Sequence, residues 1–117
     1  DDIENLGIEK TTEIALEVAW KNANAVYLSF DIDSIDCGFA PGTGWPESGG
    51  FLPREALAIL KGVAKEGVVA MEVVEVSPPY DISDITSLLG VRAMVDVLAT
   101  MVKYNRIGGK IKNFSDN

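Results

Sequence analysis

Residues 25–36 read AVYLSFDIDSID, an apolar run that breaks into alternating carboxylates. The segment from Val26 to Phe30 lacks polar alternation, which predicts a short strand covered on both faces. Asp31 and Asp33 follow at its carboxyl end, where α/β sheets bind ligands. On one side of an extended segment the two carboxylates would repel each other, and a divalent cation would relieve that repulsion. We therefore expect Asp31 and Asp33 to be metal ligands, with a helix cap or a solvated turn as the alternative.

Hydrophobic spacing along the chain predicts an α/β fold with an α-β-α-β-α order. The expected elements are a helix from Ile8 to about Lys21, the strand Val26–Phe30, a helix from Pro53 that ends at Gly67, a strand from Val68 to Val76, a long helix capped by Asp84, and a polar tail from Gly108. Residues 32–52 form a Gly/Pro-rich loop whose length is typical of a functional segment. A strand-helix-strand order implies a parallel crossover, which brings Asp31, Asp33 and Glu75 to the same edge of one sheet.

Composition limits the class of protein. The chain has 117 residues, 47% of them hydrophobic, which suits a folded chain of at most one domain. A net charge of −8 disfavours nucleic acid and anionic membranes as partners. No apolar run approaches the roughly 20 residues that span a bilayer. A single cysteine, Cys37, rules out an internal disulfide and fits a reducing, cytoplasmic compartment.

Three short motifs follow one another along the chain. They are Ser29-Phe30-Asp31-Ile32-Asp33, Pro41-Gly42-Thr43-Gly44 and Glu75-Val76-Ser77-Pro78. In order and spacing they resemble the ureohydrolase family of arginases, agmatinases and related guanidino-group hydrolases, and the resemblance runs from about Tyr27 to near Tyr104. It implies a three-layer α/β/α fold with a parallel sheet, of which residues 1–117 are a single partial domain, the C-terminal portion. Within the family the chain looks most like the agmatinases and guanidine hydrolases.

The resemblance also implies an activity. It is metal-dependent hydrolysis of a guanidino compound, agmatine-like or free guanidine, which releases urea and an amine or ammonia. In the family two divalent ions, Mn²⁺ in the first place and Ni²⁺ as the alternative, activate a water, so no side chain here is assigned as the catalytic group. Asp31 and Asp33 match metal ligands, and carboxylate oxygens suit hard ions such as Mn²⁺. Glu75 matches the family glutamate that accepts hydrogen bonds from the substrate guanidinium.

The chain contains no histidine. The family's two-metal centre also uses an N-terminal histidine and a His-x-Asp segment, so the resemblance implies that the N-terminal half with these ligands is absent from this sequence. We expect this chain alone to be inactive. One alternative is a non-catalytic subunit or truncated fragment with a structural or assembly role, which the missing histidines favour. Another is a small α/β metal- or cation-binding module unrelated to hydrolysis.

Trp45 departs from the family pattern, which commonly has threonine at this position of the loop. An indole there would shorten the pocket and stack on a flat cation, which favours a compact guanidino substrate. We therefore expect Trp45 to contact the substrate, with packing against a neighbouring subunit as the alternative. The resemblance further implies a small cationic guanidino substrate and a homo-oligomer, either a trimer or a hexamer.

Overall fold

The computed structural model describes residues 2–107, so the polar tail expected from Gly108 lies outside the described part. The α-β-α-β-α order predicted from sequence is confirmed. The elements are α1 (Asp2–Trp20), β1 (Tyr27–Asp31), the 3-10 turn η1 (Ile32–Ser34), α2 (Pro53–Glu66), β2 (Ala70–Val74), the 3-10 turn η2 (Pro78–Tyr80) and α3 (Ile85–Lys103).

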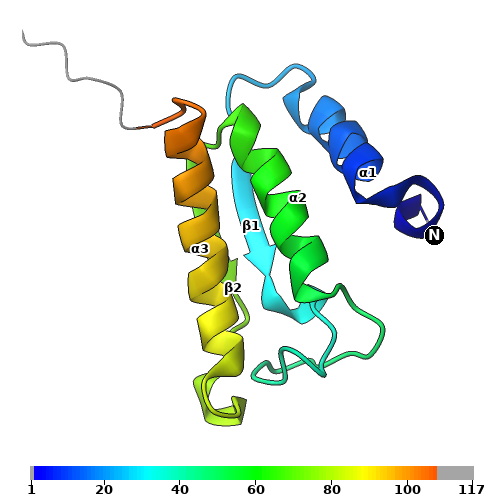
Figure 1. Ribbon diagram of the computed structural model, residues 1–117, viewed down its shortest axis with the longest axis vertical. Helices are drawn as coiled ribbons and strands as arrows, with labels where there is room; N and C mark the ends of the chain where they lie inside the picture. The colour runs from blue at the N-terminus through cyan, green and yellow to red at the C-terminus, as the bar shows by residue number, and fades with distance from the viewer. Residues whose placement is uncertain (1, 108–117) are drawn as a thin grey trace, which may run out of the picture.

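β1 and β2 pair in parallel, as the strand-helix-strand order predicts. Tyr27 is the register partner of Ala70, and Asp31 is the partner of Val74. α2 and α3 lie side by side over one face of this sheet, and α1 packs against the outer side of α2 (Figure 1). The carboxyl ends of both strands therefore point toward the long loop between β1 and α2.

Only one face of the sheet is covered by residues 2–107. Alternate residues of both strands, Leu28 and Phe30 with their partners Met71 and Val73, join the core under the helices. The opposite face is open, with Tyr27 54% exposed. The expectation that both faces would be covered is therefore not met in the part of the chain that the structure describes.

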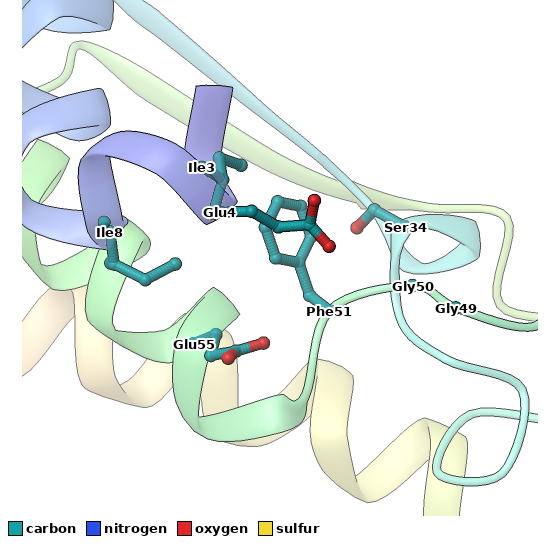
Figure 2. Close-up of a pocket in the computed structure, with 9 residues that line it drawn as sticks. Ile3, Glu4, Ile8, Ser34, Gly49, Gly50, Phe51 and Glu55 are labelled. Atoms are coloured by element: carbon teal, nitrogen blue, oxygen red, sulfur yellow. The ribbon is translucent and has the colours of Figure 1, made fainter. Parts of the chain in front are cut away.

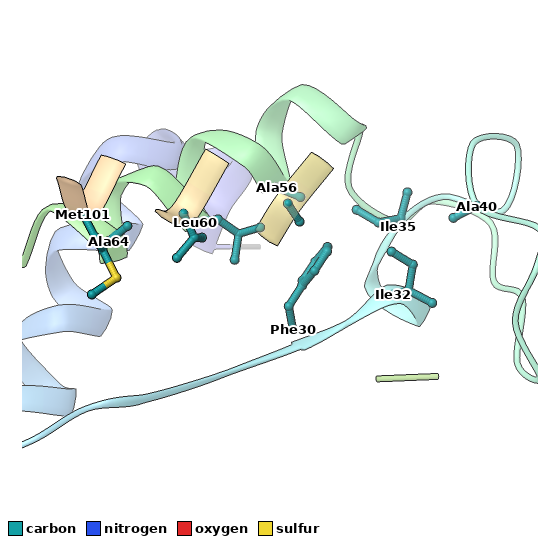
Figure 3. Packing of buried hydrophobic residues seen from close by; sticks show 10 residues of the cluster. Phe30, Ile32, Ile35, Ala40, Ala56, Leu60, Ala64 and Met101 are labelled. Atoms are coloured by element: carbon teal, nitrogen blue, oxygen red, sulfur yellow. The ribbon is translucent and has the colours of Figure 1, made fainter. Parts of the chain in front are cut away.

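The core lies between the covered face of the sheet, α2 and α3. Phe30 points from β1 toward Ala56 of α2, and Ile32 and Ile35 extend the same cluster beyond the strand (Figure 3). The full set of buried apolar residues is Phe30, Ile32, Ile35, Ala40, Ala56, Leu60, Ala64, Ala93, Val97 and Met101. Burying each larger side chain contributes about 1.5–3 kcal/mol, so this cluster holds the start of the loop against the helices.

Both ends of α2 follow from local sequence. Pro53 occupies the first turn, and the Glu55 carboxylate accepts a hydrogen bond of 2.9 Å from the Leu52 amide. Gly67 ends the helix with a φ of 93°, a conformation that costs glycine little. The expected start at Pro53 and end at Gly67 are thus confirmed.

α1 is broken at Gly7, whose φ of 80° and ψ of 163° are not helical. The regular helix therefore starts just after it, at the position Ile8 predicted from sequence. α1 approaches α2 closely, because a Cβ atom on Gly62 would lie 2.9 Å from the Thr12 methyl carbon. Glycine at this position lets the two helices pack.

α3 has one buried and one open side. Thr86, Gly90, Ala93, Val97 and Met101 are buried. A second apolar stripe is exposed and consists of Leu88, Val91, Val95, Leu98 and Val102. By length and composition alone α3 could cross a bilayer, which corrects the expectation that no apolar run approaches that length. The core helix of a soluble protein meets the same criterion, and the buried side of α3 contributes to the core.

Candidate metal and substrate site at the strand ends

The parallel register brings the candidate site residues to one edge of the sheet. Asp31 ends β1 opposite Val74, the last residue of β2. Glu75 follows Val74 directly, and Asp33 lies in η1, directly after β1. Asp31, Asp33 and Glu75 therefore lie at the same edge of the sheet, as the strand-helix-strand order predicts. Their roles in binding metal or substrate stay predictions.

The two aspartates do not lie on one extended segment, contrary to expectation. Asp31 is still in the strand, but Asp33 belongs to η1. The turn forms because the Asp31 carboxylate accepts a 2.9 Å hydrogen bond from the Asp33 amide, while the Ser34 hydroxyl donates to the Asp31 carbonyl at 2.6 Å. The helix cap that was the alternative to metal binding is thus present, because Asp31 caps η1, but the cap uses only Oδ1 of Asp31. No described residue donates a hydrogen bond to Oδ2.

Asp33 is held by a side chain from the loop. The hydroxyl of Thr43 donates to Asp33 Oδ1, and Thr43 is only 3% exposed. Within residues 2–107 no donor contacts Asp33 Oδ2. Each aspartate therefore has one oxygen oriented by a hydrogen bond and one oxygen available, a pattern that suits a metal ligand supported by its surroundings.

These two carboxylates fit part of a metal site. Oxygen donors suit Mn²⁺, although a pair of them is too few for a stable complex. Within residues 2–107 no group of three or more His, Cys, Asp or Glu side chains could hold an ion. Asp31 and Asp33 therefore fit two positions of a metal site that the described residues do not complete.

Glu75 ends β2 earlier than expected. Its φ of 65° is in the left-handed region, so the strand stops at Val74 rather than at Val76. Such a conformation costs a non-glycine residue about 1–3 kcal/mol, and residues that keep it are concentrated at functional sites. The Glu75 side chain is exposed, and no hydrogen-bond partner for it occurs among the described residues. An exposed carboxylate of this kind is free to accept N–H groups from a ligand.

Glu72 has a different environment. It lies in the middle of β2, on the open face, and accepts a hydrogen bond of 2.9 Å from the Ser29 hydroxyl. A hydrogen bond with Glu72 also raises the pKa of Tyr27. Because Glu72 already has partners on its own strand pair, Glu75 remains the better candidate for substrate contact.

The long loop is braced from within by Asp36. Its two carboxylate oxygens accept from the amides of Gly38 and Gly49, each at 2.8 Å. The Gly49 and Gly38 hydrogen bonds lower the pKa of Asp36. A Cβ atom on Gly50 would lie 2.6 Å from the Asp36 amide, so the loop closes tightly only with glycine there. Asp36 therefore braces the loop, and both of its oxygens already accept hydrogen bonds.

Trp45 lies at the surface of the loop. Its side chain is 73% exposed, so it does not fill the loop interior. The Trp45 amide donates to the Thr43 hydroxyl at 3.3 Å, and the same hydroxyl contacts Asp33. Trp45 thus lies two positions along the chain from Thr43, whose hydroxyl holds the candidate metal ligand Asp33. Substrate contact by Trp45 stays a prediction.

The cap of α3 was assigned to the wrong aspartate. Asp84 has a left-handed φ of 58°, and its side chain makes no cap hydrogen bond. Asp81 caps the helix instead, accepting from the amides of Thr86 at 3.0 Å and Ser87 at 2.9 Å. Burial alone would raise the pKa of Asp81, but the hydrogen bonds from Ser87 and Thr86 together hold it well below its usual range. Sequence reasoning missed this aspartate because it lies outside the position just before the helix.

A separate hollow of about 550 Å³ opens between the first turn of α1 and the loop. Glu4, Ser34, Phe51 and Glu55 are among the residues around it (Figure 2). Neither the aspartate pair nor Glu75 lines it. The candidate site is thus an edge of the sheet in the described part of the chain, and this hollow lies to one side of it.

Comparison with known proteins gives consistent results. Residues 1–100 match the sequence model of the arginase family. A putative agmatinase 3 of Schizosaccharomyces pombe is 51% identical over 81 residues, which are 69% of this chain and 20% of that protein. A guanidinopropionase of Pseudomonas aeruginosa is 38% identical over 103 residues, which are 88% of this chain and 32% of that protein.

A solved structure gives the same picture. The proclavaminate amidino hydrolase of Streptomyces clavuligerus superposes with a TM-score of 0.79 at 38% identity, covering 89% of this chain and 35% of that one. The expected fold, a partial α/β unit of the arginase type with a parallel sheet, is thereby confirmed. The chain spans between 20% and 35% of the length of these three proteins.

Proposed function

The chain belongs to the arginase family, and from this we propose that the protein containing it hydrolyses a guanidino compound, agmatine-like or free guanidine. The products are urea and an amine or ammonia. The observation that carries the proposal is the meeting of Asp31, Asp33 and Glu75 at the carboxyl edge of the sheet. Relatives named agmatinase and guanidinopropionase support a guanidino substrate. Because the chain spans about a third of such proteins or less, the activity is proposed for the larger protein.

Divalent ions are part of the proposal. Mn²⁺ is the first candidate and Ni²⁺ the second, and Asp31 and Asp33 would bind them through the oxygens to which no described residue donates. When bound, such ions lower the pKa of water so that a nucleophile is available near neutral pH. The remaining ligands are proposed to lie in an N-terminal half of the protein outside this sequence.

The other residues of the chain would bind and orient the substrate. The exposed Glu75 carboxylate suits the paired N–H donors of a guanidinium, since charge-assisted hydrogen bonds of this type are strong and directional. Trp45 would stack on the planar cation and limit the length of its tail. The net charge of −8 supports a cationic substrate and argues against nucleic acid as a partner.

Assembly and location follow the same proposal. We propose a homo-oligomer, trimer or hexamer, in the cytoplasm, where a single cysteine remains reduced. No membrane partner is included, because the buried side of α3 contributes to the core.

One observation favours a second candidate function, that of a non-catalytic subunit or fragment with an assembly role. The sequence has no histidine, and the described residues contain no complete group of metal ligands. Under this reading Asp31 and Asp33 only shape the turn after β1.

Urea release by the intact protein separates the two functions. The protein is loaded with Mn²⁺ or Ni²⁺ and incubated in parallel with guanidine, agmatine and arginine. We expect urea from at least one of them in proportion to the bound metal. Full metal loading without urea from any of the three would contradict the proposed hydrolysis, and absence of metal binding would favour the assembly role.

A further inference from the structure

Thr43 connects the candidate metal ligand Asp33 to the segment that carries Glu75. Its hydroxyl donates to Asp33 Oδ1, and its backbone forms an antiparallel bridge with Val76. Thr43 is 3% exposed, so this hydroxyl has little access to water as a substitute partner. Asp33 and the residue after Glu75 are therefore held by the same loop residue.

Gly42, the preceding residue, attaches this loop to α3. Its amide donates to the Thr86 hydroxyl at 2.8 Å, and its carbonyl accepts from the Ser77 amide at 2.8 Å. Thr86 is fully buried, at 0% exposure. A Cβ atom on Gly42 would lie 2.7 Å from side-chain atoms of Asp81, so only glycine allows the loop to come this close.

Asp81 in turn holds Thr86. Its carboxylate accepts from the Thr86 amide and from the Ser87 amide and hydroxyl, all at 2.9 to 3.0 Å. The hydroxyl of Thr86 is thereby presented to Gly42 from a fixed helix N-terminus. Contacts thus run without a break from Asp81 to Thr86, to Gly42, to Thr43 and finally to Asp33.

We propose that Thr43 is a positioning residue for Asp33, and that Gly42, Thr86 and Asp81 form a latch that fixes Thr43. The inference rests on the proposed function, in which Asp33 binds a metal ion. By orienting one oxygen of Asp33 the hydroxyl would leave the other available to hold the ion, and hydrogen-bond partners of this kind commonly change metal affinity by about 10–100-fold. Because the same loop is bonded to Val76 and Ser77, the latch also sets Glu75 relative to the ion, which matters for a reaction that depends on placement.

The experiment compares three threonine variants of the intact protein. Thr43→Val keeps the shape but removes the hydroxyl, and Thr43→Ser restores it. Thr12→Val is the matched control, because the nearly buried Thr12 hydroxyl also makes a hydrogen bond, to the Ile8 carbonyl at 2.7 Å, in α1 away from the site. Mn²⁺ affinity is measured by calorimetric titration, with the Tm of the metal-free protein recorded beside it.

We expect Thr43→Val to weaken Mn²⁺ binding by about 10–100-fold, while Thr43→Ser and Thr12→Val stay near wild type. Wild-type affinity in Thr43→Val, or an equal loss in Thr12→Val, would overturn the proposal. If Thr43→Val does not fold, Thr86→Val tests the latch with Thr43 intact; it should weaken Mn²⁺ binding and Thr86→Ser should restore it. Unchanged Mn²⁺ affinity in Thr86→Val would overturn the latch.

The proposed function fails in a different way. A wild-type protein that binds no divalent ion contradicts both the function and the inference. A wild-type protein that binds metal and releases urea, together with Thr43 variants of unchanged affinity, contradicts the inference alone.

Discussion

Asp31 and Asp33 are held by different kinds of donor, although they are two residues apart. Asp31 accepts from a backbone amide within its own turn, whereas Asp33 accepts from the Thr43 hydroxyl ten positions along the chain. The orientation of Asp31 therefore depends on local backbone, and that of Asp33 depends on how the loop is folded. Removing either side chain should affect the metal site more than the fold.

Asp33→Ala tests this directly in the intact protein. If Asp33 is a ligand of a two-metal site, the variant loses one ligand and the charge around the remaining ligands changes, so most urea release and part of the bound metal should disappear. Circular dichroism should change little, because Asp33 lies at the edge of the core. Elemental analysis and a urea assay measure the two effects. Full activity in the variant would mean that the aspartate only shapes the turn.

Trp45→Thr tests substrate choice. If the indole closes the pocket, its removal should raise kcat/KM for agmatine or arginine relative to guanidine by about tenfold to a few hundredfold. Guanidine turnover should fall at the same time, because stacking and shortening are lost together. Parallel assays of the three compounds on both proteins measure the ratio, and an unchanged ratio would leave Trp45 with a packing role only.

Asp81→Asn tests the cap of α3. The folded-state pKa of Asp81 is depressed, so its contribution to stability is present above the unfolded pKa of about 3.9 and is lost as pH falls below it. The metal-free variant should be less stable than wild type at pH 7, and the difference should shrink from about pH 4 downward. Denaturant unfolding across this range measures it. A difference that stays constant with pH would contradict an ionised cap.

At the level of elements, α2 and α3 are held together by small and aliphatic side chains. Ala56, Ala64 and Ala93 are nearly or fully buried and allow close approach, while Leu60 fills the space between the helices and the sheet. The outer side of α3 is equally apolar but exposed in the described part of the chain. The two sides should therefore respond differently to the same substitution.

Leu60→Ala in the 117-residue chain should lower the free energy of unfolding by about 2–5 kcal/mol, because it leaves a cavity at a side chain that is 3% exposed. Leu98→Ala is the matched control on the outer side of α3, where Leu98 is 54% exposed. It should change the free energy of unfolding by about 0.5 kcal/mol or less. Chemical denaturation measures both. Similar losses of unfolding free energy in the two variants would show that the outer side of α3 is also buried in the 117-residue chain.

At the scale of the whole molecule, two apolar or mixed surfaces are left open by residues 2–107. One is the second face of the sheet, and the other is the outer stripe of α3. A two-stranded parallel sheet with helices on one face is smaller than the complete sheets of such folds, which have helices on both faces. The chain also covers only 35% of the proclavaminate amidino hydrolase that it superposes on. That residues 1–117 are one part of a larger domain stays a prediction.

Metal retention tests that prediction. The 117-residue chain should keep little or no Mn²⁺ or Ni²⁺ after desalting, because two carboxylates are too few to hold the ion, whereas the intact protein should retain about two ions per subunit. Elemental analysis of both measures the ratio. Tight, stoichiometric metal on the short chain would show that its own residues complete the site.

Features that depend on neighbouring residues were predictable from the sequence. The element order, the ends of α2 at Pro53 and Gly67, and the edge shared by Asp31 and Glu75 follow from hydrophobic period, proline and glycine chemistry, and the rule for parallel strands. The family could be identified for the same reason, because its motifs are short and contiguous.

Features that depend on distant residues were decided by the folded chain. The amide of Gly42 reaches the hydroxyl of Thr86 across 44 positions, and no local pattern indicates that pair. The support of Asp33 by Thr43 depends on the same loop, which also bonds to Val76 and Ser77 of the β2–α3 connection. A hydrogen bond forms where packing brings donor and acceptor together, and packing joins segments that the order of residues keeps apart.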